Sequence, residues 1–129
     1  MKGQNSEYRY TDWNEVVEFE RPDGSRTASV KAAAVYSGFI SGATSVVFLM
    51  HHMHDNTGSY SGYENFKGTV DGENVSLVFR HEGTFDLEGV NARVASIGES
   101  SLGSMVELRL SCSERFIGQG PYQIRVKVD

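Results

Sequence analysis

The sequence predicts an all-β fold, a closed eight-stranded antiparallel meander barrel built by one domain spanning residues 1–129. Apolar and polar residues alternate with period two, and no stretch keeps a helical period over three turns. Turn signals rich in Gly, Asp, Asn and Pro separate eight segments of roughly 7 to 14 residues. One-sided strands leave exposed edges unless the first pairs with the last, so closure is the economical arrangement. A two-sheet sandwich is the alternative.

The first two segments form a hairpin that sets large residues against small ones. A two-residue loop at Asp23-Gly24 places Trp13 opposite Ala34 and Phe19 opposite Ala28, which suits a curved interior. The residues expected inside are Trp13, Glu15, Val17 and Phe19 from the first segment, and Ala28, Val30, Ala32, Ala34 and Tyr36 from the second.

The third segment ends at the turn of residues 55–58. Alternation is expected to turn Leu49, His51 and Met53 inward and Val46, Phe48 and Met50 outward.

The next two segments form a hairpin around Asp71-Gly72. If Asp71 lies opposite Asn74, then Phe66 faces Phe79 and Glu64 faces His81. The later inward residues are then Val90, Ala92 and Val94, followed by Val106, Leu108, Leu110 and Cys112, and finally by Tyr122, Ile124, Val126 and Val128. A short helical turn is allowed only between Ser113 and Ile117.

Composition excludes several classes of protein. Twelve basic and seventeen acidic side chains give a net charge of -5, and the basic residues form no stripe, which argues against a nucleic-acid partner. The longest uncharged apolar run, residues 46–50, is too short to span a bilayer, and residues 1–7 lack a signal-peptide core. A lone Cys112 is typical of an intracellular protein. We expect a cytoplasmic location without a membrane partner.

Glu64 and His81 are the candidate catalytic residues, with Glu15 in support. A carboxylate beside an imidazole in an apolar interior is the setting in which general acid–base chemistry occurs. The same pair could instead hold a polar group of a ligand, or the two side chains could simply satisfy each other and trapped water. All three interpretations stay open on the sequence.

The run His51-His52-Met53-His54-Asp55 raises the question of a metal. A cupin-like motif requires a later glutamate, but Gly58 and Ser59 stand there. His51 with Glu64 and His81 would resemble a two-histidine, one-carboxylate triad. A solvated histidine cluster at a strand end is the simpler interpretation, so we predict no metal and no other cofactor.

The outward side of the third segment predicts a partner surface. Phe48 and Met50, with Tyr63 and Val78 from the following segments, would make an apolar exterior patch that a monomeric barrel would normally keep polar. We expect a homo-oligomer, a dimer or trimer, with these four residues at the interface. Coverage of the patch by a loop or by the N-terminal residues is the alternative.

Several motifs in combination resemble an uncharacterised bacterial domain-of-unknown-function family that is similar in fold to allene oxide cyclase, an eight-stranded barrel. The resemblance covers residues 13–86 and rests on Trp13-Asn14-Glu15, Gly38-Phe39-Ile40-Ser41-Gly42, Phe48-Leu49-Met50, Asp55, Gly62-Tyr63-Glu64-Asn65-Phe66-Lys67-Gly68 and His81-Glu82-Gly83-Thr84-Phe85-Asp86. It implies a barrel and a homo-oligomer, and it carries no established activity.

The function predicted from these features is binding of a small, mostly apolar ligand in the lumen, anchored at one polar end. The expected ligand-binding residues are Trp13, Glu15, Tyr36, Leu49, His51, Phe66, Phe79 and Phe85. One alternative is an isomerase or cyclase acting on a lipid-like substrate through Glu64 and His81. The other is a structural homo-oligomer with a filled lumen.

Overall fold

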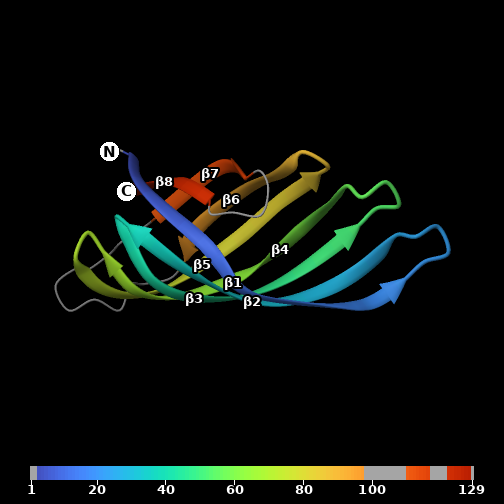
Figure 1. Ribbon diagram of the computed structural model, residues 1–129, viewed down its shortest axis with the longest axis horizontal. Coiled ribbons are helices and arrows are strands. Elements are labelled where there is room, and N and C mark those ends of the chain that lie inside the picture. The colour runs from blue at the N-terminus through green and yellow to red at the C-terminus, as the bar shows by residue number, and fades with distance from the viewer. Residues whose placement is uncertain (1–2, 98–109, 117–121, 129) are drawn as a thin grey trace.

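The computed structural model describes residues 3–97, 110–116 and 122–128, and these residues form eight antiparallel strands (Figure 1). The all-β class predicted from the sequence is therefore correct. The strands are β1 (Gly3–Glu20), β2 (Arg26–Gly38), β3 (Ile40–His52), β4 (Gly58–Val70), β5 (Glu73–Asp86), β6 (Gly89–Ile97), β7 (Leu110–Phe116) and β8 (Tyr122–Val128). The helical turn allowed after Ser113 is wrong, because β7 continues as a strand to Phe116.

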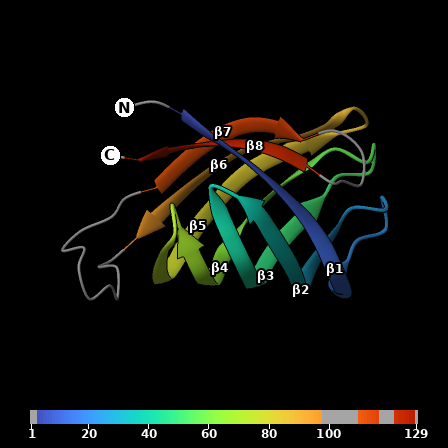
Figure 2. The same ribbon diagram turned by 60° about the vertical axis from the view of Figure 1, so that its left-hand side comes forward.

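The strands are unequal, and this corrects the predicted architecture. Pairing follows chain order, with β8 returning to the N-terminal part of β1. β1–β6 form a continuous curved sheet with long ladders (Figure 2). Among the described residues, the β7–β8 ladder pairs only Leu110 with Val128 and Ser111 with Lys127. The prediction of a regular closed eight-stranded barrel, similar to allene oxide cyclase, is replaced by a six-stranded antiparallel sheet whose two edges are bridged by two seven-residue strands.

The β2–β3 hairpin fixes the faces of the sheet. Directly paired residues project to the same face. The inner-face residues Ala32 and Val30 pair with Val46 and Phe48, which are 3 % and 2 % exposed. The last paired residues of this hairpin, Tyr36 and Gly42, are separated by the five residues 37–41. With this spacing the even-numbered residues of β3 point inward, where the sequence predicted the odd-numbered ones. The prediction that Phe48 faces outward and Leu49 inward is therefore wrong.

The β4–β5 hairpin keeps the expected parity with a different register. Val70 pairs with Glu73 around a two-residue turn, and both Asp71 and Gly72 have positive φ, 50° and 83°, as a type I′ turn requires. Glu64 therefore lies opposite Phe79, and His81 lies opposite Gly62. The predicted pairing of Asp71 with Asn74 is wrong by two residues. Because the shift is even, Glu64 and His81 still share one face.

Two irregularities alter β1. The loop after β1 has three residues in place of the predicted two, because the Arg21 N–H bonds the Ser25 carbonyl, so Phe19 lies opposite Thr27 and its predicted inward direction is wrong. A register shift between Val17 and Phe19 then places Trp13 opposite Ala32, and a second shift falls between Tyr10 and Asp12. Trp13 and Val17 remain on the inner face, yet they are 43 % and 46 % exposed. Their predicted burial is wrong, because the described residues leave the inner face exposed at this end of the sheet.

The inner face therefore has a covered end and an open end. At the covered end Ile40, Phe66 and Val70 are each 1 % exposed and pack with the other members of the larger core cluster. We call the other end, marked by Trp13 and Val17, the open end. The inward faces predicted for Val106, Leu108, Leu110 and Cys112, and for Tyr122, Ile124, Val126 and Val128, concern side chains outside the described ones.

Two tight loops stand at the open end. In the β1–β2 loop the Ser25 hydroxyl and backbone N–H donate to Asp23, and in the β3–β4 loop Thr57 donates to Asp55 in the same way. These hydrogen bonds hold the pKa of both carboxyls below its ordinary value. Their stabilisation of the loops is therefore present at neutral pH and is lost as the pH falls through the lowered pKa.

No helix long and apolar enough to cross a bilayer occurs within residues 3–97, 110–116 and 122–128.

Candidate functional site

A buried carboxylate is the centre of the candidate site. Glu64, on β4, is 2 % exposed, and donors from three other strands converge on it. The Tyr36 hydroxyl donates to Oε2 at 2.6 Å, the Thr44 hydroxyl lies 2.8 Å from the same oxygen, and Nε2 of His81 lies 2.5 Å from Oε1. Thr44 shares its one proton with the Asn65 carbonyl at 3.1 Å. These three contacts satisfy both oxygens of the Glu64 carboxyl group.

His81 is the member of this network with a hydrogen-bonding atom left over. It is 6 % exposed, and its Nε2 is committed to Glu64. Its Nδ1 is buried and has no hydrogen-bond partner among the described residues. When the ring is neutral and its Nε2 proton is directed at the carboxylate, Nδ1 presents a lone pair. Buried polar atoms are nearly always paired, so a water molecule or the polar group of a ligand is needed to satisfy this one.

A glycine on β4 brings an aromatic ring against His81. Gly62 pairs with Phe48 on one side and with His81 on the other. A Cβ at Gly62 would stand 2.1 Å from the Val47 carbonyl oxygen and 2.8 Å from Cδ1 of Phe48, so only glycine fits this approach. The Phe48 ring consequently lies with its centroid 5.0 Å from that of His81 and 5.0 Å from that of Tyr60.

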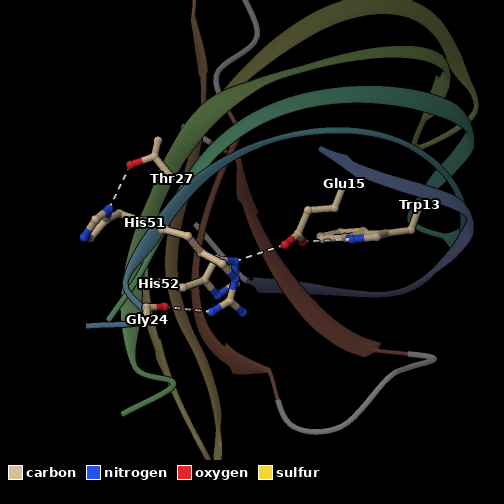
Figure 3. A network of polar contacts seen from close by, with 7 residues as sticks. Trp13, Glu15, Gly24, Thr27, His51 and His52 are labelled. Carbon is tan, nitrogen blue, oxygen red and sulfur yellow. Dashed lines mark hydrogen bonds and ion pairs between the residues drawn. The ribbon is translucent and has the colours of Figure 1, made fainter. Parts of the chain in front are cut away.

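Aromatic contacts continue from this point to the open end. The centroids of Phe48 and Trp13 are 6.4 Å apart. Nε1 of Trp13 donates to Glu15 at 3.4 Å, and the other oxygen of Glu15 lies 3.1 Å from Nε2 of His52 (Figure 3). Glu15 belongs to β1 and His52 to β3, so the pair spans β2, where small Ala28 lies fully buried. A second acid–imidazole pair thus stands at the open end.

The structure brings most of the predicted site residues to the inner face, at different depths. Tyr36, Phe66 and Phe79 are buried there as part of the core. The ring centroid of Phe66 lies 5.4 Å from that of Tyr36 and 6.2 Å from that of Phe79. Trp13 and Glu15 lie on the same face at the open end, and Phe85 is half-buried against the His52 ring. Glu64 and His81 share the interior, as the alternation predicts. Their roles in binding or catalysis stay predictions.

Two predicted ligand-binding residues are on the wrong face. Leu49 points outward and is 58 % exposed. His51 bonds through Nδ1 to the Thr27 hydroxyl at 2.9 Å, and Figure 3 shows this pair on the opposite side of the wall from Glu15. His51 therefore cannot complete a triad with Glu64 and His81. In the described part of the chain, no three His, Cys, Asp or Glu side chains are grouped to hold a metal.

The predicted oligomer interface does not form one surface. Phe48 is in the core and Met50 is half-buried on the inner face, whereas Tyr63 lies outward and is 50 % exposed. Val78 lies outward as well, paired with Asn65. The assignment of Phe48 and Met50 to this interface is wrong, because both follow the reversed parity of β3.

Sequence reasoning missed Thr44, His52 and Tyr60. Tyr60 could have been predicted from the sequence, because it is four residues before Glu64 on the same strand and alternation places both side chains on one face. Thr44 and His52 could have been found only with the odd spacing of the β2–β3 hairpin, which turns the even-numbered residues of β3 inward.

Comparison with known proteins identifies the family. None of the curated proteins compared with the chain matches it. Its fold is similar to the crystal structure of a protein with unknown function from the DUF3224 family of Shewanella oneidensis MR-1, with a TM-score of 0.77 and 14% identity over 100% of this chain and 96% of that one. The family model described as "Protein of unknown function (DUF3224)" matches residues 4–125, which confirms the predicted resemblance to an uncharacterised domain family. The chain belongs to the DUF3224 family.

Proposed function

We propose that this protein binds a small, mostly apolar molecule on the inner face of its sheet, with the one polar group of that molecule hydrogen-bonded to Nδ1 of His81. The observation that carries the proposal is that this buried nitrogen has no partner among the described residues. The neighbouring Glu64 carboxylate has three donors, so the network offers a ligand one position, at Nδ1.

The surroundings of His81 support an apolar ligand body. Phe48 and Tyr60 flank the imidazole, and Trp13 extends the aromatic surface toward solvent at the open end. Flat aromatic faces with a few convergent polar groups are typical of small-molecule sites. The Glu15–His52 pair supplies a polar rim where the ligand would meet water.

The charge of Glu64 favours one type of polar group. With the Nε2 proton directed at the carboxylate, neutral His81 accepts a hydrogen bond at Nδ1, which suits a hydroxyl or an N–H donor. A ligand carboxylate would need the imidazolium form and would stand close to the buried negative charge of Glu64. A neutral ligand with a hydrogen-bond donor is the class this geometry fits.

The same pair also supports a second function, an isomerase or cyclase acting on a lipid-like substrate. The 2.5 Å contact to Glu64 fixes the imidazole and leaves Nδ1 as the base that could remove a substrate proton. Glu64→Gln separates the two functions, because it keeps the hydrogen bond and removes the charge. Binding should survive with at most about a tenfold loss, whereas proton transfer should slow by roughly 100-fold or more.

Trp13 offers a direct assay, because it is the single tryptophan of the chain. We expect the neutral dye N-phenyl-1-naphthylamine, which carries an N–H donor, to brighten on binding and to quench Trp13 by energy transfer. His81→Gln keeps a donor toward Glu64 and removes Nδ1, so it should weaken dye binding about 3- to 10-fold. His51→Gln makes the same change on the outer face and should leave binding unchanged. Equal affinities for all three proteins would refute the role of Nδ1.

A further inference from the structure

We propose that the outer face of β3 and β4 is the surface through which two copies of this chain pair face to face. Val47, Leu49 and Tyr63 are exposed there by 52 %, 58 % and 50 %. They form, with Ser61, a four-residue outer patch in which Val47 pairs with Tyr63 and Leu49 with Ser61. Apolar clusters of this kind on a sheet face mark association surfaces.

The strand beneath the patch lacks the charges that keep such surfaces monomeric. β3 carries no Asp, Glu, Lys or Arg between Ile40 and His52. Its outward residues on the N-terminal side of the patch are the small Ser41, Ala43 and Ser45, which would let a second sheet approach closely. Charged side chains on a sheet face oppose association, and the outer face of this strand has none.

The charges that border the patch favour a second copy as the partner. Residues paired directly across neighbouring strands form rows on this face. Arg80 on β5 pairs with Tyr63 and so extends the row that begins with Val47. Glu82 on β5 pairs with Ser61 and extends the adjacent row, which begins with Leu49. Both side chains are exposed, and neither has an ion pair within the described part of the chain. On β5, therefore, one row carries a positive charge and the adjacent row a negative one. On β6 the second row continues to exposed Arg93, which lies directly opposite Glu82 in the same chain.

This arrangement is self-complementary about a two-fold axis that runs across the strands between the two rows. Rotation about that axis stacks Val47 on Leu49 of the second copy, and Tyr63 on Ser61. It also places Arg80 opposite Glu82 of the second copy, twice by symmetry. An axis along the strands would instead bring Arg80 opposite Lys31, which extends the Val47 row onto β2, and like charges would repel. The charges thus select one orientation.

A charge-reversal cycle tests this interface by sedimentation velocity and light scattering. The unmodified protein should have the mass of two chains. Arg80→Glu or Glu82→Arg turns two attractions into two repulsions and should raise the dimer dissociation constant about tenfold or more. The double variant restores opposite charges across the axis and should recover the dimer. Arg9→Glu, at an exposed position of β1 outside the proposed contact, should leave the mass unchanged.

All three reversed positions are exposed, so circular dichroism should show folded protein throughout. A monomeric parent at concentrations of tens of micromolar would overturn the proposal. A dimer that tolerates both single reversals would also overturn it, because association would then use another surface. Failure of the double variant to dimerise would refute the proposed axis, while recovery would support it.

Discussion

Replacement of Glu64 by Leu is expected to lower the free energy of unfolding by about 2–6 kcal/mol, at about 1–3 kcal/mol for each of the two buried donors left unpaired. The loss arises because Tyr36 and His81 keep buried donors that no longer find an acceptor. Thr44 can turn its proton to the Asn65 carbonyl and loses less. Urea unfolding followed by circular dichroism measures the change.

Two further variants separate the charge of Glu64 from its shape. Glu64→Gln keeps an acceptor for the hydroxyls and should cost about 1–2 kcal/mol. Combining Glu64→Leu with His81→Leu removes the stranded imidazole and should recover part of the loss. A Leu variant that unfolds no more readily than the Gln variant would contradict the network described for this site.

Phe48→Ala is expected to lower the free energy of unfolding by about 3–5 kcal/mol, because it empties a buried position between Trp13, Tyr60 and His81. Leu49→Ala, one residue along the chain and on the opposite face, should change the stability of the monomer by less than about 0.5 kcal/mol. Urea unfolding of both variants at high dilution checks the contrast. Equal losses would contradict the assignment of β3 faces.

Alternation predicted much of the sheet because it depends only on local residue order. The small residues Ala28, Ala32 and Ala34 are buried as expected, and so are Ala92 and Val94 on β6. Glu64 and His81 share a face because a tight turn at Asp71-Gly72 fixes parity whatever the exact register. The central pair of the candidate site was therefore within reach of the sequence.

The remaining features depend on geometry that residue order does not fix. One residue more or less in the connection at 37–41 decides whether Phe48 or Leu49 is buried, and both are apolar. The three-residue loop after β1 and the register shift between Val17 and Phe19 moved Trp13 away from its expected partner. Its exposure follows from the coverage of the inner face at the open end, which no local pattern reports. These non-local effects account for the errors in the predicted lining and interface.

Native mass spectrometry of protein purified without detergent tests ligand binding at His81 most directly. We predict a small-molecule adduct on the parent and on His51→Gln, and a strongly reduced adduct on His81→Gln, because that variant lacks the unpaired Nδ1. Equal adduct occupancy in all three proteins would contradict the account. So would a parent that carries no adduct and acquires none from a cellular lipid and metabolite extract.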